Sequence, residues 1–208
     1  RGAGNMLGAE QSGFIADLGY ETYQKILEEA VDELKSDEFA DLYADSDDGK
    51  RDSGSEYVRE TYIESDLELM FPPTYIPNDS ERVSLYRELD KMEEERDILA
   101  FTERLKDRFG KIPKEGKELI RIVRLRRMAK KLGMEKVVLK KGQMNIILIS
   151  NSESTYYQSK AFDKLLAFIQ KHPRECNLRD QNGKRSIVIK NVRTVETACA
   201  LVEEIEKS

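Results

Sequence analysis

The sequence predicts an α+β protein in which a loop and a helical arm precede one compact domain. Three observations lead to this fold class. Several segments carry apolar residues at helical spacing, the last third holds two hairpin signals, and apolar residues make up 39% of the 208 residues. The predicted organisation is a loop and arm over 1–35, an acidic flexible linker over 36–60, and a C-terminal domain over 61–208.

The chain opens with the glycine-rich stretch "RGAGNMLGAEQSGF", which predicts a loop over residues 1–16. The next stretch, "DLGYETYQKILEEAVDELK", predicts a helix from Asp17, because Tyr23, Ile26, Leu27 and Val31 repeat along one face.

Residues 36–60 are rich in Asp, Gly and Ser, as in "DSDDGKRDSGSE". Such a segment buries too little apolar area to offset its ordering entropy, so we expect a linker or a solvated loop. A metal-binding interpretation of the aspartates stays open, although the segment lacks the ligand register of a calcium loop.

The first elements of the domain are a strand and three helices. The alternation in "ESDLELMF" predicts a strand over 64–71, and Ser80 is the expected cap of the helix that follows. A second helix, "RDILAFTERLKDRFG", ends at Gly110, and a third, "KEGKELIRIVRLRRMAKKLG", ends at a glycine as well.

The last third predicts a β-β-α unit that occurs twice. "EKVVLKKGQMNIILIS" and "CNLRDQNGKRSIVIKN" each indicate two strands around a Lys-Gly or Asn-Gly turn. Helical patterns follow each pair, in "YYQSKAFDKLLAFIQKH" and "TVETACALVEEIEK". We therefore expect the three helices to pack with a small mixed or antiparallel sheet.

Several chemistries are missing from the sequence. It has no GxxxxGK[ST] loop, a single histidine (His172), and two cysteines (Cys176 and Cys199) without CxxC spacing. These features predict neither a metal site nor an enzyme, and no cofactor in this chain. A net charge of −5 argues against nucleic-acid binding by bulk charge. With no signal peptide and no long apolar run, we expect a cytoplasmic protein without membrane contact, and the initial arginine suggests a piece of a longer chain.

The opening loop and the third helix each have two interpretations. Gly2, Gly4, Gly8 and Gly13 fit a plain surface loop, or a hinged lever that presents Arg1 and Gln11 to a neighbouring domain. The basic residues of helix 114–132 can contact DNA phosphates, or their stems can cover the apolar stripe of the same helix. The candidate phosphate contacts are Arg121, Arg124, Arg127 and Lys131.

The stretch "RGAGNMLGAEQSG" resembles the motif R-G-x-G-x-x-x-G-x-x-Q-S-G, which RecG-type helicases share with the bacterial transcription-repair coupling factors, the Mfd family. "GYETYQKILEEAV", "ERLKDRFGKIP" and "LRRMAKKLG" also resemble landmarks of the coupling factors. The chain is therefore identified as similar to the C-terminal region of that family, with residues 37–60 as the weakest part.

The resemblance implies a parent that is an ATP-dependent translocase on double-stranded DNA, with ATP and Mg²⁺ bound upstream of this chain. That parent displaces stalled RNA polymerase and recruits the excision-repair damage-recognition protein. Arg1 and Gln11 match the residues that couple the motor to DNA movement.

The resemblance also implies a role for the C-terminal domain. It docks on the upstream repair-factor-binding module of the same protein and masks it. By position, Asp107 and the neighbouring Glu103 match the carboxylates of this latch, although Arg104 stands where relatives can carry an acid. A solvated helix face is the other interpretation of these two residues. A stand-alone nucleic-acid-binding module using helix 114–132 is the alternative function.

Overall fold

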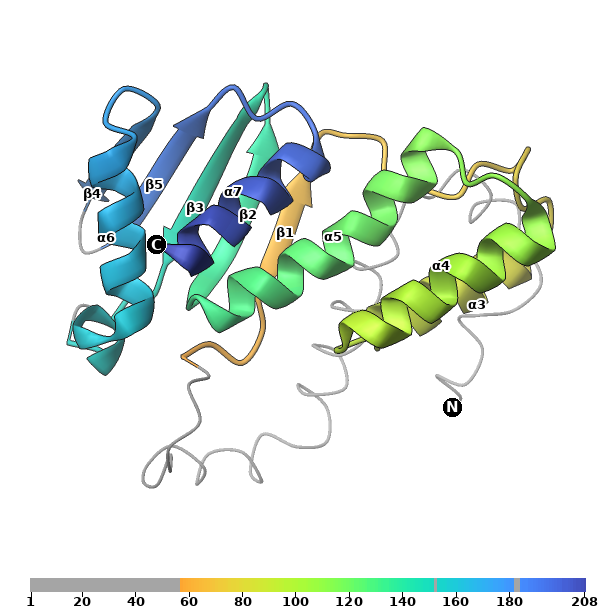
Figure 1. Cartoon of the computed structure of the whole chain (residues 1–208), viewed down its shortest axis with the longest axis horizontal. Coiled ribbons are helices and arrows are strands. Elements are labelled where there is room, and N and C mark those ends of the chain that lie inside the picture. The colour runs from red at the N-terminus through yellow and green to blue at the C-terminus, as the bar shows by residue number, and fades with distance from the viewer. Residues whose placement is uncertain (1–56, 152, 182–183) are drawn as a thin grey trace, which may run out of the picture.

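Residues 57–151, 153–181 and 184–208 are described by a computed structural model of the chain, shown in Figure 1. The predicted opening loop, the helical arm and nearly all of the acidic segment lie outside these residues. The boundaries proposed at 35 and 60 therefore remain predictions.

Five strands form one mixed sheet in the order β1-β2-β3-β5-β4, as Figure 1 shows. The short first strand runs parallel to β2, and every other neighbouring pair is antiparallel. The predicted α+β class and small mixed sheet are thus confirmed. The strands are β1 (Tyr62–Ser65), β2 (Met134–Lys140), β3 (Gln143–Leu148), β4 (Cys176–Gln181) and β5 (Lys184–Lys190).

The first strand lies earlier than the sequence predicted. The expected strand over 64–71 was wrong, because pairing with β2 covers Tyr62–Ser65. The Ser65 hydroxyl accepts the Leu67 N–H at 3.0 Å, and the chain then turns away from the sheet. Leu69 and Phe71 are buried, but against the helical part of the core. Alternating burial along an irregular segment therefore imitated a strand.

Three helices connect β1 to β2: α3 (Asp79–Asp90), α4 (Glu95–Phe109) and α5 (Lys114–Lys131). The cap of α3 is Asn78, whose Oδ1 accepts the Glu81 N–H at 2.9 Å, so the prediction of Ser80 as the cap was wrong by two residues. Gly110 ends α4 at φ 82°, as the sequence predicted.

The predicted β-β-α unit does occur twice. The first unit is β2, β3 and α6 (Lys160–Lys171), and the second is β4, β5 and α7 (Val195–Lys207). Lys141 and Gly142 join β2 to β3 with positive φ angles of 53° and 69°, which suit a tight hairpin turn. A short 3₁₀ turn, η2 (Thr155–Gln158), precedes α6.

Helices α5, α6 and α7 lie on one face of the sheet, and α3 and α4 form a hairpin beside α5 (Figure 1). Along the strands, alternate residues point toward these helices. The register joins Val137, Ile146 and Ile187 in one buried row, and Leu139, Met144 and Ile189 in another. No described helix is both long and apolar enough to cross a membrane.

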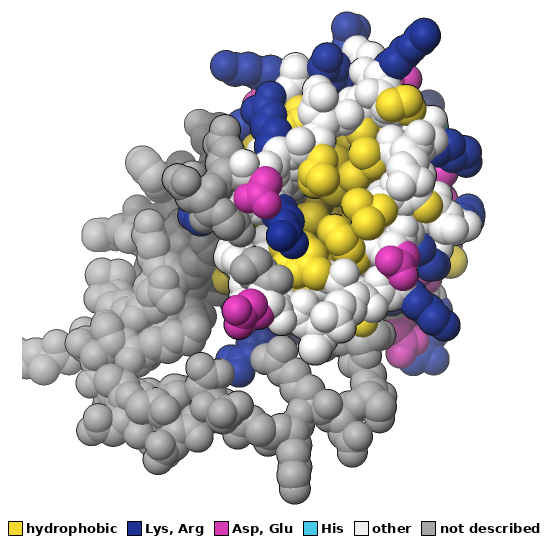
Figure 2. Space-filling view, turned by 90° about the vertical axis from the view of Figure 1, so that its left-hand side faces the viewer, with side chains coloured by type: hydrophobic (Ala, Val, Ile, Leu, Met, Phe, Trp, Pro, Cys, Tyr) yellow, Lys and Arg dark blue, Asp and Glu magenta, His cyan; other side chains and the backbone are white. Residues whose placement is uncertain are grey.

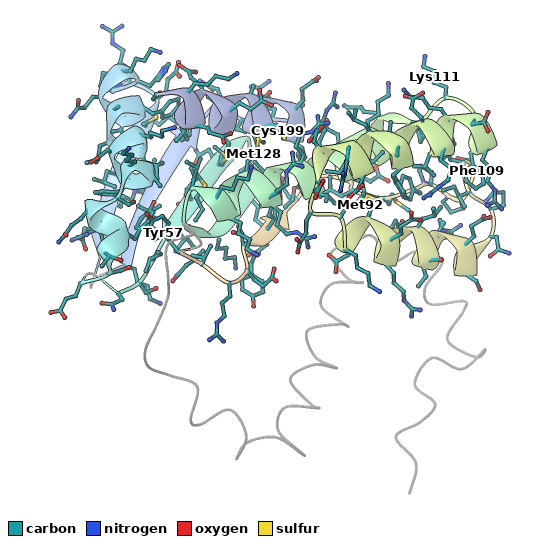
Figure 3. The ribbon with its side chains drawn as sticks, turned by 60° about the horizontal axis from the view of Figure 1, so that its bottom comes forward. Tyr57, Met92, Phe109, Lys111, Met128 and Cys199 are labelled. Atoms are coloured by element: carbon teal, nitrogen blue, oxygen red, sulfur yellow. The ribbon has the colours of Figure 1, made fainter. Side chains whose placement is uncertain are left out.

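Helix α5 links the two parts of the domain. It packs on the sheet, on α7 and on both helices of the hairpin, so buried residues occur around most of its circumference. Figure 3 shows Met128 of α5 and Cys199 of α7 where these helices meet. The Cys199 thiol donates to the Arg121 carbonyl at 3.5 Å, and burial raises the pKa of this thiol to about 12. Cys199 is therefore a packing residue and not a reactive thiol.

Candidate interdomain interface

The outward face of α4 carries the two carboxylates that the sequence singled out. Glu103 and Asp107 are four residues apart, so they lie one above the other on the helix surface, and both are exposed. Leu99 precedes Glu103 by the same interval and is 54% exposed. We call Leu99, Glu103 and Asp107 the α4 stripe.

The opposite side of α4 is held within the domain. Ile98, Phe101 and Leu105 are buried against the core. Tyr75 donates its hydroxyl to the carbonyls of Leu105 at 3.2 Å and Gly110 at 3.1 Å. The helix is therefore a fixed platform for the side chains on its outer face.

Two ion pairs join α4 to α3. Arg104 bonds to Glu88 and Arg108 bonds to Glu81, each at 2.5 Å. Arg104 also lies over the Phe101 ring, 5.3 Å from its centroid. The arginine that departs from the family pattern thus has a partner inside this domain.

The carboxylates of the α4 stripe are less constrained. Glu103 pairs with Lys106 at 2.7 Å across a surface where both side chains are largely exposed. Asp107 forms no ion pair with any residue of the described ranges. A cationic partner surface can therefore engage Asp107 without first breaking an internal pair.

The arginines of α5 differ from the α4 stripe, because all four of them already pair with carboxylates of this domain. Arg121 pairs with Glu118 at 2.8 Å and with Glu196 at 2.7 Å. Arg124 and Arg127 both pair with Glu95 at the start of α4.

Glu95 is the residue on which two of these arginines converge. Its side chain is partly desolvated, which opposes ionisation, but Arg124 and Arg127 together keep the pKa of Glu95 below its usual value. A phosphate at this place has to displace a bound carboxylate. Lys131, the fourth candidate phosphate contact, is exposed and forms no ion pair with a described residue.

The apolar stripe of α5 is buried beneath these basic side chains. Leu119, Val123, Met128 and Leu132 are each at most 6% exposed. This burial agrees with the interpretation in which the stems of the arginines cover the stripe.

The structure brings some predicted site residues together and leaves others apart. Glu103 and Asp107 share one face of α4, and Arg124 and Arg127 share one carboxylate. Arg1, Gln11, Gly2, Gly4, Gly8 and Gly13 lie outside the described residues. Sequence reasoning missed Leu99, although its i−4 spacing from Glu103 was a visible signal. It also missed Glu95, which no local pattern connects to α5.

No group of three His, Cys, Asp or Glu side chains in the described ranges is arranged to hold a metal ion. The acidic stretch for which a metal-binding interpretation was considered lies almost wholly outside those ranges.

The fold is that of a known domain class. It resembles a crystal structure of the C-terminal domain of a transcription-repair coupling factor, with a TM-score of 0.59 and 15% sequence identity. The match covers 71% of this chain and 92% of the other.

Sequence comparison identifies the family itself. Residues 65–159 match the TRCF domain family. The transcription-repair-coupling factor of Escherichia coli K12 is 33% identical over 138 residues, which is 66% of this chain. That of Mycobacterium tuberculosis is 32% identical over 137 residues, also 66% of this chain. That of Rickettsia prowazekii is 27% identical over 197 residues, or 93% of this chain. The chain belongs to the transcription-repair coupling factor family.

The chain spans only a small part of these relatives, 11% of the Escherichia coli and Mycobacterium tuberculosis proteins and 16% of the Rickettsia protein.

Proposed function

We propose that this chain is the regulatory C-terminal segment of an ATP-dependent double-stranded DNA translocase that removes stalled RNA polymerase and recruits excision repair. The proposal rests on family membership. In it, ATP and Mg²⁺ are bound by upstream parts of the parent protein, the segment itself hydrolyses no nucleotide, and the protein acts in the cytoplasm.

The domain over 61–208 has an autoinhibitory role in this proposal. The α4 stripe docks on the upstream repair-factor-binding module and masks it until the motor engages. The observation that carries this assignment is a contrast between side chains of α4. Arg104 and Arg108 form ion pairs with α3 inside the domain. Leu99 and Asp107 face outward and have no partner among the described residues. A latch that must open suits a modest, partly charged contact of this kind.

The masking is tested in the full-length parent by Asp107→Arg. Reversing this charge places a cation against a surface selected for an acid, so basal binding of the repair factor should rise about tenfold in a pull-down without DNA. Asp163→Arg on α6 makes the same charge change at an exposed site away from α4 and should leave that binding at its basal level. Equal binding by the wild type and Asp107→Arg would refute the assignment.

The opening loop has a coupling role in the same proposal. Arg1 and Gln11 relay the nucleotide state of the motor to the DNA grip, and the glycines act as hinges. In the full-length parent, Arg1→Ala should therefore reduce DNA translocation by about tenfold or more while DNA-stimulated ATP hydrolysis falls less than twofold. A triplex-displacement assay and a phosphate-release assay measure the two rates. A parallel loss of both would show that Arg1 serves the ATPase and not its coupling.

A further inference from the structure

Strand β4 is an edge strand of the sheet. It pairs with β5 on one side, and no strand of the described residues lies on its other side. An unpaired edge presents free N–H and C=O groups and can accept another strand. The turn over residues 173–175 comes directly before β4, which limits any added pairing to residues 176–181.

The ladder with β5 determines which backbone groups of β4 face outward. Lys190 donates its N–H to the Glu175 carbonyl at 3.1 Å, and Cys176 lies opposite Ile189. Residues of an antiparallel strand bond to the two sides in alternation. Asn177 and Arg179 therefore face β5, and Leu178 and Asp180 direct their N–H and C=O groups to the free edge.

The free edge borders an apolar patch. Leu178 is 48% exposed, and its register partner Ile187 is buried beneath the helices, so Leu178 projects on the same side as α6. Helix α6 packs over β4 and carries the partly exposed Leu166 and Ile169. Figure 2, which looks at this side of the molecule, shows an apolar patch surrounded by charged side chains.

We propose that a second copy of the chain covers this edge, with β4 pairing antiparallel to β4 about a two-fold axis at Leu178. Only residues whose backbone groups face outward, such as Leu178 and Asp180, can bond to the added strand. An even-numbered residue of one copy must therefore lie opposite an even-numbered residue of the other. In this register, Leu178 lies opposite Leu178 of the second copy, and Asn177 lies opposite Arg179.

Charge disfavours the registers centred further along the strand, and ladder length disfavours the register centred on Asn177, which pairs only residues 176–178. Moving the axis one residue along the strand sets Arg179 directly opposite Arg179 of the other copy, and one residue further sets Asp180 opposite Asp180. Like charges in direct cross-strand positions are destabilising. The Leu178 register has neither conflict, and it buries the exposed leucine at the axis.

The pairing also accounts for the apolar patch. A two-fold axis perpendicular to the sheet keeps both sets of helices on one face of the joined sheet. The two copies of α6 then flank the axis, and their partly exposed Leu166 and Ile169 side chains lie on the side that the second copy covers. Strand addition thus removes a free edge and an exposed apolar patch together.

Analytical ultracentrifugation of the 208-residue chain tests the dimer. The wild type should show a monomer–dimer equilibrium, and Leu178→Asp should weaken it at least tenfold. Tyr62→Asp changes another exposed apolar side chain, on β1 at the opposite edge of the sheet, and should leave the equilibrium unchanged. A wild-type chain that stays monomeric at 200 μM overturns the proposal, and so does a dimer that Leu178→Asp leaves intact.

Disulfide formation tests the register. Directly opposite residues of a hydrogen-bonded pair have Cα atoms about 5.5 Å apart, within the range of a disulfide. Leu178→Cys should therefore cross-link two chains under mild oxidation. Asn177→Cys places the two thiols on Cα atoms about 8 Å apart, which is beyond that range, and should not cross-link. Efficient cross-linking of Asn177→Cys, or none of Leu178→Cys, contradicts the assigned pairing.

Discussion

At the scale of single residues, Gly133 is fixed by both conformation and space. It follows α5 with a φ of 69°, and a Cβ at this position would lie 2.3 Å from Cε2 of Tyr156. That ring cannot easily retreat, because it is fully buried and its hydroxyl donates to the Leu132 carbonyl at 3.0 Å. It also stacks edge-on against Tyr57, with ring centroids 5.3 Å apart, where the described chain begins (Figure 3).

Gly133→Ala should therefore lower the free energy of unfolding by about 3 kcal/mol, since overpacking adds to the strain of a positive φ. Gly142 is a matched control, because its φ is also 69° and its nearest neighbour, Arg193 Cγ, would lie 3.5 Å from an added Cβ. Gly142→Ala should cost only about 1 kcal/mol. Urea denaturation gives both values, and equal losses would mean that the Tyr156 contact has no energetic role.

Glu64 ties β1 to β2 by charge, since it pairs with Lys136 at 2.7 Å and with Lys140. Hydrogen bonds to these two lysines lower the pKa of Glu64 from 4.5 to about 2. A carboxyl whose pKa is lower in the folded state stabilises the fold above its unfolded pKa. This contribution is lost as the pH falls from about 4.5 to about 2.

The difference in unfolding free energy between the wild type and Glu64→Gln should therefore be larger at pH 7 than at pH 3. At pH 7 we expect about 0.5 kcal/mol, because the carboxyl is 39% exposed and solvent screens the pairs. Urea denaturation at both pH values measures the difference. A constant difference would show that the ion pairs contribute no stability.

At the scale of secondary-structure elements, the ion pairs between the start of α4 and the arginines of α5 neutralise part of the positive charge on the α5 surface. Glu95→Gln removes the carboxylate that Arg124 and Arg127 share. The two freed arginines should then raise the affinity of the chain for duplex DNA at low salt about threefold or more, with a steeper salt dependence. Fluorescence anisotropy with a labelled duplex measures both.

Glu153→Gln is the control for this change, because it neutralises an exposed glutamate away from α5 and should raise affinity only slightly. Equal increases in the two variants would mean that Arg124 and Arg127 do not reach DNA. Sub-micromolar binding by the wild-type chain at physiological salt would instead favour the nucleic-acid-binding alternative.

The elements that the sequence predicted well are those with local signals. Helices α4 and α5 have a clear apolar spacing and end at or just before a glycine, and the Lys141–Gly142 turn defines the first hairpin. Strand β1 was misplaced because its limits are set by β2, about seventy residues away. The position of β5 between β3 and β4 likewise depends on pairing between distant segments, which no local pattern contains.

In the candidate site, too, the features set by local spacing could be predicted from the sequence, and the features set by packing between helices could not. The shared face of Glu103 and Asp107 follows from helical spacing alone, and so does the position of Leu99. The pairing of Arg124 with Glu95 joins residues 29 positions apart on two helices, so only the packed structure shows that this arginine is already engaged. The sequence predicted which α5 side chains are basic, but it held no information on which of them are free.

At the scale of the whole molecule, the two surfaces proposed for association lie apart on the domain. The α4 stripe lies on the helical hairpin, and the β4 edge lies at the far end of the sheet (Figure 1). A chain that pairs through β4 therefore keeps its α4 stripe accessible. Substitutions on one surface should not affect contacts made by the other.

The most direct test of the account is titration calorimetry of the 208-residue chain with the purified repair-factor-binding module of its parent protein. The wild type should bind at micromolar concentration, and Leu99→Asp and Asp107→Arg should each weaken binding at least tenfold, with Asp163→Arg unchanged. If the module does not bind the wild type, or binds all four chains equally, the α4 stripe is not the surface by which this domain masks its partner.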